Sequence, residues 1–296
     1  MASIPKSPAY GIISAEETQA PATRQALYGR LEEQLGMPVL SYFTSFRFPV
    51  MMDDSDVQLI EQALQASDFS RGCALLINSP GGDGLAAENI INLCRTYSGT
   101  GSYIALVPRR AKSAATMVCF GASKIRMGPS AELGPIDPQL FIDGTPFSVC
   151  NLVESYQDLF KRAVANKTGR IEPFLQQLAH YDEREIKEYE NAISLSTEIA
   201  IKALKSGMMK EKSTKAIEKA IQIFVEPKHT KSHGRPIYAP EAIACGLKIE
   251  PITKDSPEWP DLYELNMRLD NLVSSKASKC IETKEHSFIA QTPQQH

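Results

Sequence analysis

The chain has 296 residues, of which 43% are hydrophobic, and its formal net charge at pH 7 is −3. This length suffices for one large α/β domain with a sizeable core, and the small negative charge gives no reason to expect nucleic acid as a partner. Six cysteines without a C-x-x-C spacing favour reduced core residues of a cytoplasmic protein over a disulfide framework or a zinc site.

The N-terminal residues 1–36 are rich in Ala, Pro, Ser and Gln, with one weakly helical piece at 23–35. We expect an N-terminal arm here, suited to wrapping a neighbouring subunit. No signal peptide is recognisable, and no apolar run anywhere reaches the roughly 18 residues of a membrane span, so we expect no integral membrane segment.

The stretch from Cys73 to Gly84 is the most informative part of the chain. Its apolar run at 74–77 is typical of a strand buried on both faces. The run stops at a Ser-Pro-Gly-Gly turn that contains Gly81 and Gly82, and a helical pattern follows over 85–96. A glycine turn before a helix presents free N–H groups that can stabilise an oxyanion. Taken alone, the motif fits a simple tight βα turn better than an oxyanion site.

A second notable stretch surrounds Ser113. A short apolar strand at 103–107 ends at Pro108, and a compact helix made of small residues starts at Ser113. Strands that alternate with helices at this spacing predict βαβ units and a mostly parallel sheet. Without other information, Ser113 would be interpreted as a plain helix N-cap.

Beyond about residue 150 the pattern becomes helical. The segment 182–206 carries an apolar stripe too wide for one core, which predicts a subunit contact and therefore a homo-oligomer. From about Ser275 the chain is polar, and we expect a disordered tail.

Three pieces in this order resemble the Clp protease/crotonase superfamily: the Ile-Asn-Ser-Pro-Gly-Gly turn at 77–82, the serine among small residues at 113, and the segment 235–247, which is similar to signal peptide peptidase A enzymes. The stretch Leu-Gly-Pro-Ile-Asp-Pro-Gln at 133–139 most resembles the SDH-family Clp-fold serine proteinases. The resemblance covers roughly residues 37–252. It implies an α/β fold, a Clp protease/crotonase-like spiral of βαβ units with a helical oligomerisation arm.

The resemblance implies that Ser113 is the nucleophile of a serine endopeptidase. The N–H groups of Gly81 or Gly82 and of Ala114 would form the oxyanion hole. It implies a peptide or protein substrate, and no metal or other cofactor. The expected layout is an N-terminal arm (1–36), a peptidase domain (37–252, with its core at 37–150 and a helical part at 151–252), and a C-terminal helix with a disordered tail (253–296).

The general base is the open question in the sequence. Clp proteases carry a histidine in the turn where this chain has Asp137, which argues against their usual triad. By analogy with signal peptide peptidase A, a lysine would serve instead. Helical spacing places Lys167 towards the core and Lys161 away from it, so Lys167 is the predicted base of a Ser-Lys dyad.

Other assignments stay open at this stage. Lys167 also fits a helix C-terminal charge, and His229 and His233 fit a surface loop. The same fold holds acyl-CoA hydratases and isomerases, for which Asp83, Glu88 and Glu132 would be the carboxylates to consider. A scaffold without catalytic activity is a further alternative.

Overall fold

The computed structural model describes residues 21–48, 50–142, 145–167 and 169–291. Its centre is a seven-stranded sheet in which five neighbouring strands are parallel. In spatial order the strands are β10 (Ile249–Pro251), β5 (Ile125–Met127), β3 (Tyr103–Val107), β2 (Cys73–Asn78), β1 (Val39–Thr44), β11 (Ala277–Glu282) and β12 (Ser287–Gln291). The predicted α/β class with a mostly parallel sheet is therefore confirmed.

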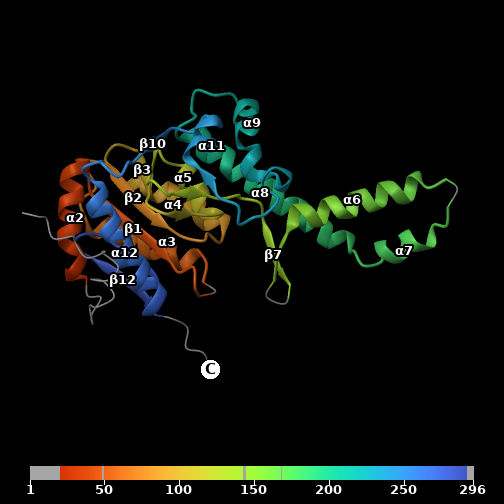
Figure 1. Ribbon diagram of the computed structural model, residues 1–296, viewed down its shortest axis with the longest axis horizontal. Helices are drawn as coiled ribbons and strands as arrows, with labels where there is room; N and C mark the ends of the chain where they lie inside the picture. Colours follow the sequence, from red (N-terminus) through yellow and green to blue (C-terminus); the bar gives the residue numbers. More distant parts are fainter. Residues whose placement is uncertain (1–20, 49, 143–144, 168, 292–296) are drawn as a thin grey trace, which may run out of the picture.

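Helices cover both faces of this sheet (Figure 1). Three connections between parallel strands each run through one helix on the same face: α3 (Asp54–Ala66), α4 (Gly84–Tyr97) and α5 (Ala114–Phe120). The opposite face is covered by α2 (Ala22–Leu35) and α12 (Trp259–Ser275).

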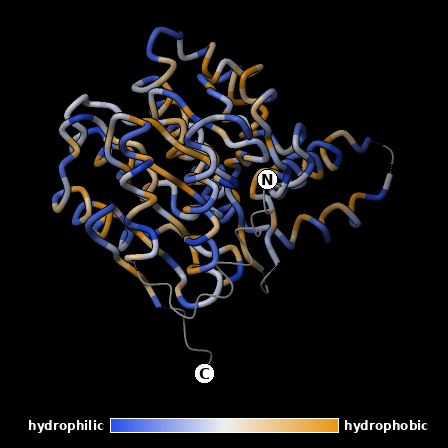
Figure 2. Tube along the Cα trace, turned by 60° about the vertical axis from the view of Figure 1, so that its left-hand side comes forward, coloured by the Kyte–Doolittle hydropathy of each residue, from blue (hydrophilic) through white to orange (hydrophobic). Residues whose placement is uncertain are grey.

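Alternation along β2 explains why the sheet is buried on both faces. Leu75 and Ile77 belong to the hydrophobic cluster with α3, α4 and α5, whereas Ala74 and Leu76 belong to the cluster with α2 and α12. An uninterrupted apolar run is the sequence pattern of such a strand. Hydrophobic stretches are accordingly concentrated in the middle of the molecule (Figure 2).

Smaller elements lie around the carboxyl ends of the parallel strands. One small sheet contains β4 (Arg110–Ala111), β6 (Glu132–Leu133) and β9 (Ile237–Tyr238), and a hairpin contains β7 (Gln139–Ile142) and β8 (Thr145–Ser148). The remaining helices are α6 (Val149–Ala165), α7 (Glu172–Leu178), α8 (Glu183–Ser206), α9 (Thr214–Val225), α10 (Pro227–Thr230) and α11 (Ala239–Ala244).

A helical arm projects from the body of the molecule (Figure 1). It is made of α6, α7 and the first part of α8, and the C-terminal half of α8 returns to pack on α4, α5 and α9. Within the described residues, no helix has the length and apolar character needed to cross a membrane.

Residues 1–20 of the expected N-terminal arm and 292–296 of the expected tail lie outside the described residues. The helix α2 does form at the predicted place, but it packs against α12 and the sheet of its own chain. The C-terminal residues 277–291 were expected to be disordered, and that prediction is wrong because they form β11 and β12. A buried ion pair joins the two ends, since the Arg24 guanidinium donates to both Glu282 carboxylate oxygens at 2.7 and 2.6 Å.

The wide apolar stripe of α8 also has an explanation within one chain. Ile199, Ala200 and Leu204 are buried against the main hydrophobic cluster, and Leu195 lines the cleft described below. The width of the stripe therefore reflects contacts on several sides of α8 inside the same chain, and it gives no support to a subunit contact at this helix.

Candidate active site

The glycine turn after β2 is fixed between two other segments of the chain. Gly81 and Gly82 have φ values of 96° and 150°. A Cβ built on Gly81 would lie 2.5 Å from the carbonyl oxygen of Lys112, and one on Gly82 would overlap the carbonyl oxygen of Met52. Glycine is therefore required at both positions for conformational and steric reasons.

Ser113 occupies a strained turn between β4 and α5. Its φ of 49° and ψ of −123° are unusual for a residue with a side chain, and such a conformation costs on the order of 1–3 kcal/mol. Although Ser113 is the N-cap residue of α5, its hydroxyl caps no N–H of the helix. A serine on a strained strand-to-helix turn is the arrangement that exposes a nucleophilic hydroxyl.

Thr116 stabilises this turn from below. Its hydroxyl donates to the carbonyl oxygen of Ala111 at 2.7 Å, lies 3.1 Å from that of Gly134, and accepts from the N–H of Gly134 at 3.1 Å. The strained backbone at Ser113 is thus held by contacts on both sides of the turn.

The backbone N–H groups of the glycine turn and of Ala114 differ in whether they already have an acceptor. The N–H of Gly81 donates to Ser79 Oγ at 3.1 Å. In the part of the chain that the structure describes, the N–H groups of Gly82 and Ala114 have no acceptor. The N–H of Ala114, the residue after Ser113, and that of Gly82, which lines the same cleft as Ser113, are therefore available, whereas the N–H of Gly81 is already engaged.

Asp137 is at the centre of a buried polar group. The residue is 2% exposed, and its Oδ2 accepts hydrogen bonds from Gln139 Nε2 at 2.8 Å and Ser148 Oγ at 2.9 Å. Its Oδ1 lies 2.7 Å from Nδ1 of His233. A carboxylate at Nδ1 keeps the proton on that nitrogen and leaves Nε2 as the acceptor of the ring.

The backbone around Asp137 is fixed as well. The N–H of Ile136 donates to the carbonyl oxygen of Phe224 on α9 at 2.7 Å, and the Ser196 hydroxyl on α8 donates to the carbonyl oxygen of Ile136, also at 2.7 Å. The carboxylate is therefore preorganised before any substrate arrives.

Ser113, the glycine turn and His233 line one cleft of about 840 Å³. Two ionisable side chains, Asp83 and His233, line it among the described residues. Its larger apolar lining residues, apart from three prolines, are Phe46, Phe48, Val50, Met51, Leu85, Met117, Ile136, Phe141, Phe147, Leu195 and Ile199. Such a cleft favours uncharged, apolar groups over charged ones.

The predicted lysine base lies elsewhere. Lys167 follows the end of α6, where it is exposed, and it does not line the cleft that contains Ser113. The prediction that Lys167 faces the core is wrong because α6 ends at Ala165, so helical geometry no longer applies at residue 167. Lys161 points outward as predicted and pairs with Asp158 at 3.7 Å.

Lys112, the direct neighbour of Ser113, is held by other partners. Burial lowers the pKa of its ammonium group, while the nearby Glu132 carboxylate, 2.8 Å away, opposes that shift. Its Nζ also donates to the carbonyl oxygen of Leu133 at 3.3 Å. Lys112 therefore joins the Ser113 turn to β6.

His233 was interpreted from the sequence as a residue of a surface loop. It does lie in the loop after α10, but its ring reaches Asp137, which is 96 positions earlier in the chain. One feature of the sequence pointed to this contact. Asp137 lies in a rigid turn next to apolar Ile136, and a buried carboxylate needs a hydrogen-bonding partner.

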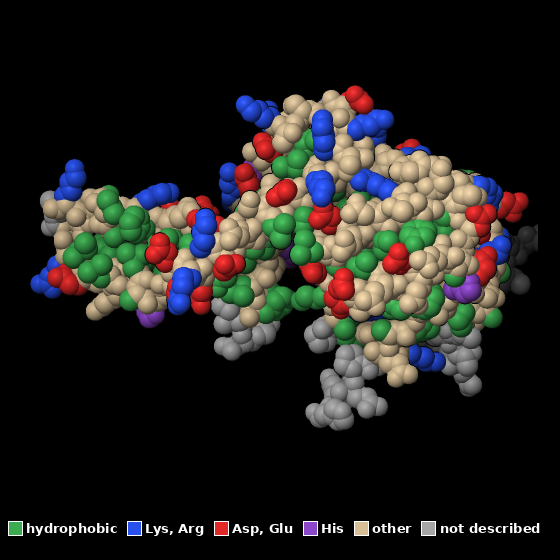
Figure 3. Space-filling view, turned by 180° about the vertical axis from the view of Figure 1, so that it is seen from behind, with side chains coloured by type: hydrophobic (Ala, Val, Ile, Leu, Met, Phe, Trp, Pro, Cys, Tyr) green, Lys and Arg blue, Asp and Glu red, His purple; other side chains and the backbone are tan. Residues whose placement is uncertain are grey.

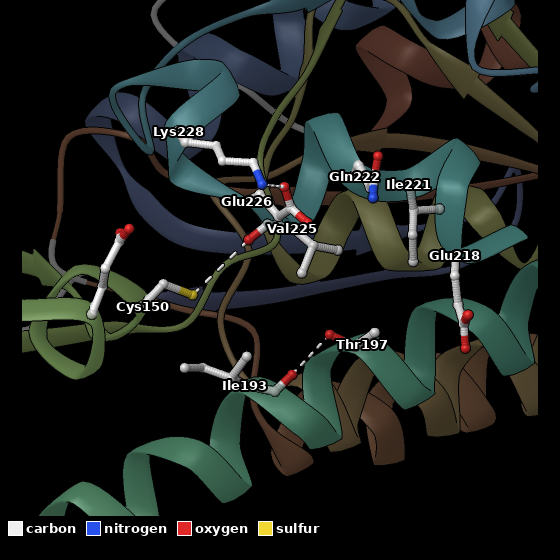
Figure 4. Close-up of a pocket in the computed structure, with 10 residues that line it drawn as sticks. Cys150, Ile193, Thr197, Glu218, Ile221, Gln222, Val225, Glu226 and Lys228 are labelled. Carbon is white, nitrogen blue, oxygen red and sulfur yellow. Dashed lines mark hydrogen bonds and ion pairs between the residues drawn. The ribbon is translucent and has the colours of Figure 1, made fainter. Parts of the chain in front are cut away.

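A smaller hollow of about 440 Å³ lies between α6, α8 and the α9–α10 segment (Figure 4). Within it the Cys150 thiol points towards the carbonyl oxygen of Val225, at 4.0 Å. Burial, reinforced by the charge of Asp137, raises the pKa of Cys150 to about 12. The thiol therefore stays protonated at neutral pH and is a poor nucleophile.

The carboxylates that an acyl-CoA enzyme would require have other roles here. Asp83 caps α4 by accepting from the N–H of Leu85 at 2.8 Å. Glu88 pairs with Lys202, and Glu132 pairs with Lys112. Each of the three carboxylates therefore already has a partner.

Several known proteins are similar to this chain. Two uncharacterized proteins of Methanocaldococcus jannaschii, MJ0137 and MJ1495, are 34% and 26% identical to it over 105 and 122 residues. These matches cover 36% and 41% of this chain but 33% and 37% of the relatives, so the chain spans about a third of the length of the curated relatives it matches.

A solved structure of a mutant of the membrane-bound stomatin-specific protease 1510-N with a substrate peptide is also similar, with 16% identity and a TM-score of 0.30. The likeness covers 74% of this chain and 93% of that one, and it is too distant to support an argument. The family of ClpP-like SDH-type serine proteinases matches residues 31–281, which is most of the chain. On that match, the chain belongs to the ClpP-like SDH-type serine proteinase family.

Proposed function

We propose that the protein is a serine endopeptidase in which Ser113 is the nucleophile, His233 the general base and Asp137 the residue that orients the histidine. The observation that carries this proposal is the 2.7 Å contact between the buried Asp137 and the partly exposed His233, which lines the same cleft as Ser113. This assignment replaces the Ser-Lys dyad expected from the sequence, because Lys167 is exposed on the arm.

The proposed reaction begins when the Ser113 hydroxyl attacks the carbonyl carbon of a peptide bond and its proton passes to Nε2 of His233. The negative charge that forms on the substrate oxygen is stabilised by the N–H groups of Gly82 and Ala114, which lack other acceptors among the described residues. Gly81 is the weaker choice of donor because its N–H is engaged by Ser79.

The carbon–nitrogen bond then breaks, and His233 returns the proton to the leaving amine. This leaves an ester between the acyl part of the substrate and Ser113. Water, deprotonated by His233, hydrolyses the ester and restores the serine. In both steps Asp137 stabilises the positive charge on the imidazole.

The cleft further indicates which peptides would bind. Because its lining is dominated by aromatic and aliphatic side chains, we propose that the substrates are extended, unfolded segments with apolar side chains. Folded proteins bury such segments, so the proposed substrates are unfolded chains or exposed apolar tails.

A covalent labelling experiment tests the nucleophile. Incubation with a fluorophosphonate probe should modify Ser113, and peptide mapping should identify that residue. The Ser113→Ala variant should lose both labelling and hydrolysis of an apolar peptide mixture while it keeps the melting temperature of the parent to within a few degrees. Hydrolysis that persists in Ser113→Ala would contradict the peptidase mechanism.

The same experiment addresses the two alternatives. A scaffold without catalytic activity would not react with the probe at all. An acyl-CoA hydratase or isomerase of this fold uses the oxyanion donors without a serine nucleophile, so labelling at Ser113 would argue against it. The engagement of Asp83, Glu88 and Glu132 by other groups already favours the peptidase.

We also propose that the arm mediates self-association in the cytoplasm. Hydrophobic side chains gather over the outer part of the arm (Figure 3), where Phe160 and Val164 are 51% and 69% exposed. Apolar side chains exposed together on one segment are typical of a protein interface. The cysteines of the described chain are all free thiols, as expected for a reducing compartment.

A further inference from the structure

A charged cluster in which Lys279 and Asp56 are buried and Asp53 is half-exposed lies at the start of α3. The Lys279 side chain on β11 is 9% exposed, and its ammonium group contacts Asp53 Oδ2 at 2.7 Å and Asp56 Oδ2 at 2.9 Å. The Tyr42 hydroxyl donates to the same Asp56 oxygen at 2.8 Å. The cluster therefore joins β11, through Lys279, to β1 and to the start of α3.

The two aspartates of the cluster form the cap of α3. Asp53 is the N-cap residue, and its own N–H donates to Asp56 Oδ2 at 2.9 Å, so the pair makes a reciprocal capping box. Asp53 Oδ1 in turn accepts from the N–H of Ser55 at 2.9 Å. The position of the cap therefore fixes the backbone directly before it.

Met52 is the residue directly before this cap, and its backbone bonds to the glycine turn on both sides. Its N–H donates to the carbonyl oxygen of Gly81 at 2.8 Å, and its carbonyl oxygen accepts from the N–H of Asp83 at 2.9 Å. The same carbonyl lies so close to Gly82 that no Cβ would fit there. A shift of Met52 would consequently shift the N–H of Gly82, one of the proposed oxyanion donors.

Lys279 is the cation that makes this arrangement stable. Asp56 is fully buried, and its Oδ1 has no hydrogen-bonding partner among the described residues. Burial raises the pKa of this carboxyl group, and the Lys279 contact is the largest influence opposing that rise. Without Lys279, a buried carboxylate would lose its counter-charge, which is strongly destabilising. The cap of α3 would then rearrange.

We propose that Lys279 is a positioning residue for the oxyanion turn, acting from β11 through Asp56, the cap of α3 and Met52 on Gly81 and Gly82. This inference rests on the proposed function for its catalytic consequence, although the chain of contacts itself is independent of any activity. It makes the C-terminal hairpin of β11 and β12 a support of the active site.

A matched pair of variants tests the proposal. Lys279→Met should lower kcat for peptide hydrolysis about 10-fold and leave KM unchanged, because a displaced oxyanion donor affects the transition state more than substrate binding. Arg24→Met is the control: it removes the cation from a more deeply buried ion pair, with Glu282 of the same strand, and Glu282, unlike Asp53 and Asp56, is not part of the cap of α3. It should lower the melting temperature without lowering kcat.

Amide hydrogen exchange supplies a readout that does not depend on catalysis. In Lys279→Met, the amides of residues 52 and 83 should exchange faster than in the parent, whereas in Arg24→Met they should not. Should Lys279→Met fail to fold, Tyr42→Phe removes one donor to Asp56 and should show a smaller effect of the same kind. Lys279→Arg should restore part of the lost kcat.

The outcomes separate this inference from the proposed function. Unchanged exchange at residues 52 and 83 in Lys279→Met, or in Tyr42→Phe if that variant is needed, would overturn the positioning role. An equal loss of kcat in Arg24→Met would show that Lys279 affects kcat through general stability, and would contradict a specific positioning role. A parent protein without hydrolytic activity would refute the proposed function, while the exchange measurements would still decide whether Lys279 holds the turn.

Discussion

At the scale of single residues, backbone geometry distinguishes the proposed nucleophile from the other serines of loops and caps. Ser113 combines a positive φ with a hydroxyl that caps no helix N–H. The sequence shows a serine among small residues at position 113, and its resemblance to the family predicted that this serine is the nucleophile. It could not show the strain, because the conformation depends on Gly81 and Gly134 packing against the neighbouring Lys112.

The strain predicts an unusual order of stability. Ser113→Gly should be about 1 kcal/mol more stable to unfolding than Ser113→Ala, because glycine adopts the φ of 49° without steric cost while alanine keeps the strain. Both variants lack the nucleophile, so activity does not confuse the comparison. Urea unfolding monitored by circular dichroism measures the difference. An alanine variant as stable as the glycine variant would show that Ser113 is not strained.

The glycine turn allows a second comparison. Gly82→Ala places a Cβ against the Met52 carbonyl, whereas a Cβ on Gly101, which also has a positive φ, meets nothing within 4 Å. Gly82→Ala should therefore cost more stability than Gly101→Ala, by about 1–3 kcal/mol for overpacking, and it should lose labelling by the fluorophosphonate. If Gly82→Ala and Gly101→Ala were equally stable and Gly82→Ala were still labelled, the glycine turn would not need its observed position for the reaction.

At the scale of elements, the apolar stripe on α8 has a different role from the subunit contact that its width suggested, while the expectation of an oligomerisation arm stays a prediction. The stripe on α8 is covered within the chain, so Ile193→Glu with Leu204→Glu would place a charge on a fully buried leucine and disrupt the fold instead of separating subunits. The exposed apolar side chains lie further out, on the arm. Periodicity identified both helices but not which of their faces would find partners inside the same chain.

Self-association through the arm is tested by charges on α6. Phe160→Glu with Val164→Glu should shift the sedimentation coefficient towards that of the monomer and leave the melting temperature nearly unchanged, because both side chains are exposed. Ser155→Glu with Arg162→Gln changes the net charge equally at two other exposed positions of the same helix and should have no effect. A monomeric parent at micromolar concentration would refute the proposed association.

At the scale of the whole molecule, local sequence patterns were sufficient to predict the layered α/β core. They were not sufficient to predict the C-terminal strands or the general base. The strand at 73–78 and the helix that follows it were predictable from an apolar run, a glycine turn and a cap. β11 was not, because Lys279 and Glu282 are buried only through partners more than 200 positions away. Asp137 and His233 are likewise far apart in the sequence, by 96 positions, so their contact could not be predicted without knowledge of the fold.

The rate constant for fluorophosphonate labelling of Ser113 in the His233→Ala and Lys167→Ala variants tests the central claim most directly. If His233 is the base, its replacement should slow labelling by roughly 10²–10⁴-fold, the usual contribution of a general base. Lys167→Ala should label at the rate of the parent, since Lys167 is exposed and outside the cleft. A large loss in Lys167→Ala combined with normal labelling of His233→Ala would contradict the account and restore the Ser-Lys dyad.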